Sequence, residues 1–129
     1  MPRLISVDLV YGTSIDVTFT TSREVCDACD TAVLQLAHAN GSELGIRIER
    51  GRIADVYLWD AAQFIRQNLP PNHVAIDGLR ISCTIPLALL PAGALAPRVE
   101  ATLSINGTPV QTRFPVAIRA LHHADLHLA

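Results

Sequence analysis

The chain has few aromatic residues, few charged residues and no long hydrophobic run. Of its 129 residues only 5% are aromatic and 17% are charged, whereas 50% are hydrophobic. A core with so few rings must be aliphatic, and its β-branched residues favour strands. The richest apolar stretch, residues 85–96, is interrupted by prolines and a glycine, so no segment reaches the roughly 18 residues that a transmembrane helix needs. We therefore expect no membrane insertion.

Charge and cysteine content are also low. A formal charge of -2, a pI near 6.2 and scattered arginines leave no basic surface for nucleic acid, so no nucleic acid is expected as a partner. Three cysteines are an odd number for a secreted disulfide scaffold, and the N-terminus turns polar at Asp8 before a signal-peptide core can form. These features predict a cytoplasmic location. The length predicts one domain spanning residues 1–129.

Alternating apolar residues on both sides of Asn106-Gly107 predict a β-hairpin formed by residues 99–105 and 110–118. Asn tolerates, and Gly readily adopts, the positive φ that a two-residue loop requires. Such a loop would pair Leu103 with Val110 and Val99 with Phe114. The apolar face of this ribbon must then be covered by another sheet, because two strands alone are only marginally stable.

A second hairpin is predicted for residues 32–38 and 43–49. A two-residue loop between them would place leucines opposite charged side chains. A three-residue loop, with Gly41 in the left-handed region, pairs Leu34 with Ile46 and Leu36 with Leu44 instead. We expect the three-residue loop.

The remaining pattern predicts further strands and a single helix. Asp60 is expected to cap a short helix over residues 61–68, which Pro70-Pro71 ends. The proline-rich residues 86–97 are expected to form an extended crossover. The other expected strands are residues 4–11 and 15–20, which form a hairpin or lie in different sheets, and residues 53–59 and 79–85. Seven to eight strands with one short helix predict an all-β, antiparallel, immunoglobulin-like β-sandwich.

Motifs for catalysis or metal binding are missing or incomplete. The chain has no P-loop, GxGxxG, GxSxG or paired-carboxylate motif, so we expect no enzyme and no cofactor. Cys26-x-x-Cys29 has only Cys83 and the histidines to complete a zinc site, and we interpret it as a pair of loop thiols. His123 and His127 have helical i, i+4 spacing but lack the glutamate of a zinc-protease motif. These residues suggest, as a third functional interpretation after the two given below, a small metal-dependent protein that uses Cys26, Cys29 and a histidine.

Residues 55–59 carry the best functional signal. If the even-numbered residues of the range 54–58 face the core, Tyr57 and Trp59 project from the opposite face beside Asp55. Exposed aromatic rings stack on sugars, while acidic, arginine and glutamine side chains bind the hydroxyls. The candidate ligand-binding residues are Tyr57, Trp59, Asp55, Arg47 and Gln35. The alternative is that Tyr57 and Trp59 point inward or cover a dimer partner.

Several segments resemble a known family. Residues 11–19 (YGTSIDVTF), the Asn40-Gly41 hairpin and residues 81–93 (ISCTIPLALLPAG), which precede the strand 99–105, are similar to parts of the C-terminal polysaccharide-recognition domain of ABC-type O-antigen exporters. The resemblance implies an immunoglobulin-like sandwich that dimerises by strand exchange and binds the modified end of a glycan before export. It covers neither residues 61–71 nor the nucleotide-binding domain that precedes this domain in the family. The chain would then be an excised domain or a free-standing relative.

Together these observations predict a non-catalytic homodimeric domain that recognises a carbohydrate or a polysaccharide end. The alternative is a structural or assembly subunit of the phage or secretion-system type, in which the same face makes protein contacts.

Overall fold

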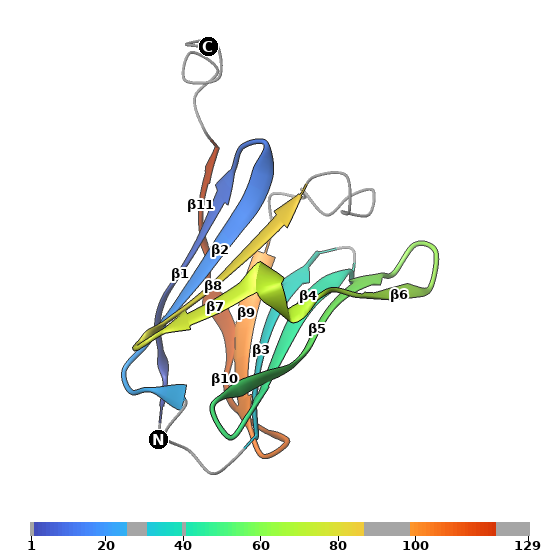
Figure 1. Cartoon of the computed structure of the whole chain (residues 1–129). Helices are drawn as coiled ribbons and strands as arrows, with labels where there is room; N and C mark the ends of the chain where they lie inside the picture. Colours follow the sequence, from blue (N-terminus) through green and yellow to red (C-terminus); the bar gives the residue numbers. More distant parts are fainter. Residues whose placement is uncertain (1, 26–30, 40, 87–98, 121–129) are drawn as a thin grey trace.

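The computed structural model describes residues 2–25, 31–39, 41–86 and 99–120, and these form two stacked sheets (Figure 1). One sheet has five strands in the order β11-β1-β2-β8-β7, and the other has six in the order β10-β9-β3-β4-β5-β6. The strands are β1 (Leu4–Tyr11), β2 (Ser14–Thr21), β3 (Thr31–His38), β4 (Glu43–Glu49), β5 (Arg52–Asp60), β6 (Ile65–Asn68), β7 (Val74–Asp77), β8 (Arg80–Pro86), β9 (Val99–Ile105), β10 (Thr108–Pro115) and β11 (Ala117–Ala120), with a 3-10 turn η2 (Pro71–His73) before β7. The expected all-β antiparallel sandwich is confirmed, with eleven described strands.

The core lies between the inner faces of the two sheets and is aliphatic, as the composition predicts. Its most deeply buried side chains come from both sheets and include one ring, Phe19, packed with Leu34, Ile46, Ile81 and Leu103. Most strand residues on the opposite parity are partly or fully exposed, and Gly45 is an exception. This alternation is the period-two pattern expected of sheets with one buried face.

The first two strands form a hairpin, which decides between the two arrangements left open by the sequence. Leu9 pairs with Val17 and Tyr11 with Ile15. The register shifts between Leu4 and Ser6, so Ile5 is 59% exposed although it has the same parity as buried Val7. A β-bulge inserts one residue and turns the following side chains to the other face.

The β3–β4 hairpin has the predicted register. Leu34 pairs with Ile46 and Leu36 with Leu44, and Gly41 has a φ of +92°. In this register the leucine pairs meet on the inner face. A register shifted by one residue would place the leucines opposite charged residues and is therefore disfavoured. The three-residue loop is therefore confirmed.

The β9–β10 hairpin has the predicted loop but not the predicted register. Asn106 and Gly107 have φ of 52° and 81°, as a two-residue loop requires. Two register shifts in β10 then pair Gln111 with Leu103 and Phe114 with Ala101, so the expected partners Val110 and Phe114 are displaced. Bulges bend and twist a strand. After them the chain leaves the six-stranded sheet and continues as β11, which pairs with β1 of the other sheet in parallel (Figure 1).

The predicted helix over residues 61–68 is wrong. Asp60 Oδ1 does accept hydrogen bonds from the backbone N–H groups of Ala62 (3.0 Å) and Gln63 (3.3 Å), as a helix cap would. The chain then reverses at Phe64, which has a φ of 54°, and Ile65 pairs with Asp60 as the first residue of β6. Asp caps helices and turns with the same hydrogen bonds, so the local signal was shared by both structures.

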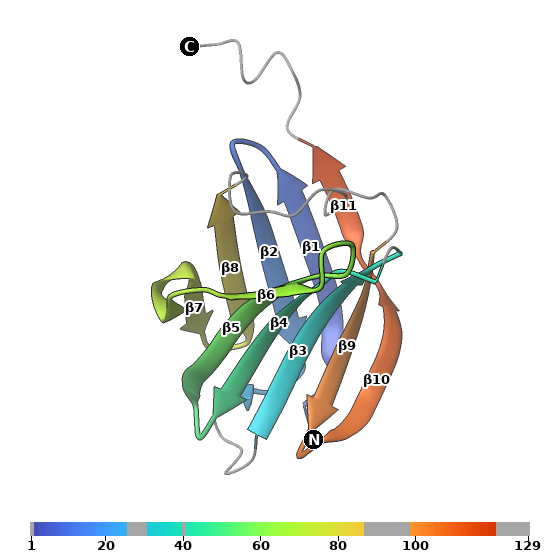
Figure 2. The same ribbon diagram turned by 90° about the vertical axis from the view of Figure 1, so that its right-hand side faces the viewer.

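The β5–β6 hairpin projects away from the sandwich. In Figure 1 its turn reaches beyond the six-stranded sheet, and in the perpendicular view of Figure 2 it passes in front of β4 and β3. Both views therefore place the hairpin over the outer face of that sheet.

Several predictions fall on residues outside the described ranges. They concern the crossover at 87–97, the thiols Cys26 and Cys29, and His123 and His127. Within the described ranges no helix has the length and apolarity to cross a membrane.

Candidate functional site

The candidate site lies on the outer face of the six-stranded sheet, where side chains of four neighbouring strands stand in register. One row across β3, β4, β5 and β6 contains Gln35, Gly45, Tyr57 and Asn68. The next row contains Ala37, Glu43, Trp59 and Arg66, and Glu100 of β9 continues it beyond Ala37. Val56 and Leu58 are buried on the inner face, so Tyr57 and Trp59 project outward, which decides between the two orientations left open by the sequence.

The inward set of β5 differs from the prediction at one position. Ala54 is exposed, because a bulge opposite Arg47 and Ile48 pairs Ile48 with Ile53. Ile53 therefore packs against the core in place of Ala54. The outward side chains from Asp55 onward keep the expected parity.

Tyr57 lies across Gly45 of the neighbouring strand. A Cβ atom at Gly45 would be 2.2 Å from the Cε1 and Cζ atoms of Tyr57. The hydroxyl of Tyr57 accepts a hydrogen bond of 3.3 Å from Gln35 Nε2, one strand further on. The missing side chain at Gly45 thus provides the space in which the ring spans β4.

Arg66 covers the ring of Tyr57. Its guanidinium carbon lies 4.3 Å from the ring centroid, which is a cation–π contact. Arg66 also forms an ion pair with Asp55 and donates from Nε to Asn68 Oδ1 at 3.1 Å. Tyr57 is therefore held between neighbouring groups, which leaves its ring less free to stack on a ligand than that of Trp59.

Gln35, Tyr57 and Glu43 form one hydrogen-bonded group. Gln35 Nε2 donates to Glu43 Oε2 at 3.2 Å, and the Tyr57 hydroxyl is hydrogen-bonded to the same carboxylate. Burial raises the pKa of Glu43, and the bond from Tyr57 opposes this rise. Burial likewise raises the pKa of Tyr57, so the phenol stays protonated and keeps donating at neutral pH.

Trp59 has an aromatic neighbour in the turn of the projecting hairpin. The ring of Phe64 meets it edge to face, with centroids 6.1 Å apart and an interplanar angle of 64°. Phe64 is 78% exposed and the next residue, Ile65, is 53% exposed. Trp59 itself is half-buried, so Phe64 extends its aromatic surface into solvent, and the two rings form an aromatic corner beside the polar group described above.

The five predicted site residues share the outer face, but the structure groups them unequally. Gln35 contacts Tyr57 directly, and Asp55 is linked to it through Arg66. Arg47 is turned to Glu49, with Nη1 and Oε1 2.6 Å apart, and takes no part in this group. Sequence reasoning missed Arg66 and Phe64 because they were assigned to a helix. It also missed Gly45 as a site residue, although a glycine inside a strand is a signal for close approach.

Gly45 and Tyr57 should be energetically coupled. Gly45→Ala in the wild-type background displaces the ring from Gln35 and Arg66, so we expect a loss of about 1–2 kcal/mol of stability. In a Tyr57→Ala background the same substitution should stabilise by about 0.5–1 kcal/mol, since alanine is favoured over glycine within strands. Urea unfolding of the four proteins measures this sign change. Equal effects of Gly45→Ala in the two backgrounds would contradict the packing described here.

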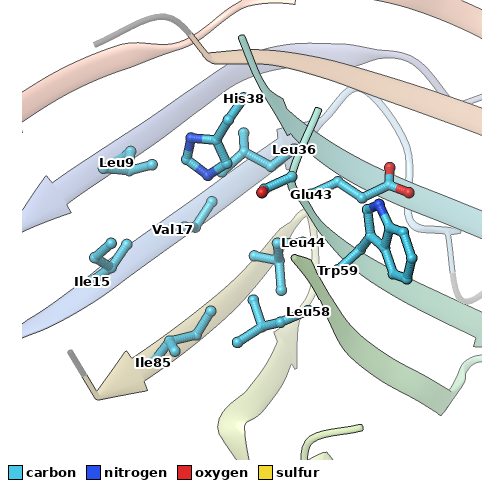
Figure 3. Close-up of a pocket in the computed structure, with 11 residues that line it drawn as sticks. Leu9, Ile15, Val17, Leu36, His38, Glu43, Leu44, Leu58, Trp59 and Ile85 are labelled. Carbon is cyan, nitrogen blue, oxygen red and sulfur yellow. The ribbon is translucent and has the colours of Figure 1, made fainter. Parts of the chain in front are cut away.

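A separate cavity lies between the sheets and is too small for a ligand. It measures about 20 Å³ and is lined mostly by aliphatic side chains, with His38 at its wall (Figure 3). His38 Nδ1 is buried with no hydrogen-bond partner among the described residues, and burial lowers the pKa of this imidazole. A space of this size holds about one water molecule. The outer face is therefore a better candidate than this cavity.

Within the described ranges, no three His, Cys, Asp or Glu residues are grouped as a metal site would require. Cys83, the one described free cysteine, is buried in the core. The class defined by the structure is thus a two-sheet β-sandwich with a polar and aromatic outer face. Comparison with family models, curated proteins and solved structures finds no match to this chain.

Proposed function

We propose that the chain is a non-catalytic binding domain that recognises a carbohydrate or the end of a polysaccharide on the outer face of β3–β6. The observation that carries the proposal is the Trp59–Phe64 corner beside hydrogen-bonding side chains that are already held in place. Sugars present C–H faces for stacking and hydroxyls for polar contacts, so this combination suits them. The similarity of residues 11–19 and 81–93 to the glycan-recognition domain of O-antigen exporters supports the same ligand class.

The contacts suggest a division of roles among the predicted residues. Trp59 stacks on the sugar, while Gln35 and Tyr57 position Glu43 to accept hydrogen bonds from it. Asp55 holds Arg66 over Tyr57 and thereby stiffens the face. Arg47 lies at the margin. A cytoplasmic location and a homodimer belong to the same proposal.

Glycan binding should change the emission of Trp59, which is the only tryptophan in the chain. We expect a saturable fluorescence shift when a binding oligosaccharide is titrated in. Calorimetry should show at least a tenfold loss of affinity for Trp59→Ala, since removing a stacking ring costs about 1.4 kcal/mol or more. Ile5→Ala, a change at an exposed apolar residue of the other sheet, is the matched control and should bind normally. Absence of a response across a broad glycan array would refute carbohydrate recognition.

Protein assembly is the second candidate, and the exposure of Phe64 and Ile65 favours it. Two large apolar side chains on a projecting hairpin are more common at protein contacts than on free surfaces. This role predicts an oligomer whose mass rises with concentration in sedimentation velocity and which Phe64→Ser or Trp59→Ala weakens. If the wild-type protein and both variants are monomers at all concentrations, self-assembly is excluded as a role of this face.

A further inference from the structure

The charges on the proposed face are unevenly compensated. Arg66 is paired with Asp55, and Arg47 with Glu49, whereas Glu43 forms no ion pair with any described residue. Glu43 stands directly beside Trp59 in the register of β4 and β5, and Figure 3 shows its carboxylate on the side of the indole. A ligand stacked on Trp59 therefore meets an uncompensated negative charge.

The hydrogen bonds of Glu43 leave acceptor capacity for a ligand. A carboxylate has about four lone-pair positions, and the contacts from Gln35 and Tyr57 account for two of them. Those contacts also restrain the side chain, so little rotamer entropy is lost when a ligand binds. The remaining positions can accept hydrogen bonds from hydroxyl or ammonium groups, but they repel a carboxylate or a phosphate.

An ammonium group gains a second interaction at this position. A cation within about 6 Å of an indole face is attracted by the ring, and Trp is the strongest partner of this kind. The small side chain of Ala37 follows Glu43 along the row, and Glu100 lies beyond it. The neighbourhood of Glu43 thus offers room for a substituent. The positive charge on that side is Arg113 of β10, which lines a surface hollow with Ala37 and Glu100 and lies two strands beyond Ala37, on the far side of Glu100.

We infer that the site selects saccharide ends that are uncharged or carry a free amine over ends that carry a carboxylate or a phosphate, and that Glu43 is the specificity-determining residue. This inference rests on the proposed carbohydrate function. Its ligand class is defined by charge and hydrogen-bond donors, with Trp59 as the stacking platform.

A glycan array with amine-bearing, neutral, carboxylated and phosphorylated ends tests the inference on the full chain. The strongest binder is then titrated by calorimetry beside derivatives that differ only in the charge of the end group. We expect at least a tenfold weaker affinity for the carboxylated or phosphorylated derivative. In Glu43→Gln this preference should fall to less than threefold, while the neutral ligand still binds.

Two further variants separate a local effect from a general one. Asp55→Asn releases the charge of Arg66 next to Trp59, so binding of anionic derivatives should improve. Glu49→Gln removes the same charge from the same face at a residue paired with Arg47, and it should leave the preference unchanged. Equal effects of Glu43→Gln and Glu49→Gln would overturn the assignment of Glu43.

The possible failures are distinguishable. If no glycan of any charge class binds, the proposed function itself fails. If glycans bind but anionic ends bind as well as the others or better, the proposed function stands and the inferred selectivity is wrong.

Discussion

Above pH 9 the free energy of unfolding should fall by about 1.4 kcal/mol per pH unit through Cys83 alone, approaching a loss of about 4 kcal/mol near pH 12. Cys83 is 1% exposed, and burial raises the pKa of its thiol from 9.0 to about 12, with a smaller contribution from Asp16. The unfolded chain releases this proton from pH 9 onward, whereas the folded chain retains it. The free energy of unfolding that the protonated Cys83 thiol contributes is therefore fully present below pH 9. It is lost as the pH rises from 9 through the pKa of the folded state, about 12.

Urea titrations between pH 7 and pH 11 measure this slope. The chain has no lysine, so above the range of its histidines the other side chains that titrate are the remaining cysteines and the two tyrosines. Burial also raises the pKa of Tyr11 and Tyr57, and both therefore add to the alkaline loss. Cys83→Ala removes only the thiol contribution and should flatten the profile. An alkaline slope that is identical in wild type and Cys83→Ala would show that the thiolate is tolerated in the folded core.

The parts of the fold that could be predicted from sequence are those in which one local signal excludes the alternatives. At Asn40-Gly41 the leucines can avoid charged partners in only one register, and the structure has that register. At Asn106-Gly107 the turn was equally clear, but the register beyond it depends on two bulges in β10. These bulges accompany the crossing from one sheet to the other, which is a tertiary feature without a local pattern.

Asp60 illustrates a signal that two structures share. Its carboxylate accepts the backbone hydrogen bonds of Ala62 and Gln63 in a turn, just as it would at a helix start. The left-handed conformation of Phe64 makes this segment a turn and not a helix. A phenylalanine rarely adopts that conformation, so the residue type did not predict it. Because residues 61–68 were predicted to be helical, Arg66 and Phe64 were not included in the candidate site.

Parity predicted that Tyr57 and Trp59 share one face, but which face points outward was decided only by the structure. Burial of Val56 and Leu58 requires Tyr57 and Trp59 to project outward, whatever the neighbouring strands are. The contacts across the face were not predictable, because they depend on strand order. Gln35 and Tyr57 can form their hydrogen bond because β4 lies between their strands and has Gly45, which has no side chain, at the position between them.

Replacing Gln111 by leucine should lower the free energy of unfolding by about 2–6 kcal/mol, because the Gln111 side chain supplies hydrogen bonds to β1 where no described neighbouring strand does so. β11 pairs with β1 only from Asp8 onward, and on that side of β1 the backbone of Leu4 meets the Gln111 amide instead. Oε1 accepts from the N–H group of Leu4, and Nε2 donates to its carbonyl at 3.3 Å. Leu4 is 4% exposed, so Gln111→Leu leaves two backbone groups without partners at about 1–3 kcal/mol each.

Gln111→Glu is a more specific test than Gln111→Leu. It keeps the shape of the side chain and replaces only the Nε2 amide donor with a carboxylate oxygen. At neutral pH the introduced carboxylate can accept from the N–H group of Leu4 but repels its carbonyl, so this variant should be less stable than wild type. Protonation restores a donor, and the deficit should shrink as the pH falls through the pKa of the carboxyl, which the carbonyl raises. Gln111→Leu has no such group, and its deficit should not depend on pH. Amide hydrogen exchange at Leu4 reports the same contact directly: exchange in Gln111→Leu as slow as in wild type would show that the side chain does not cap β1.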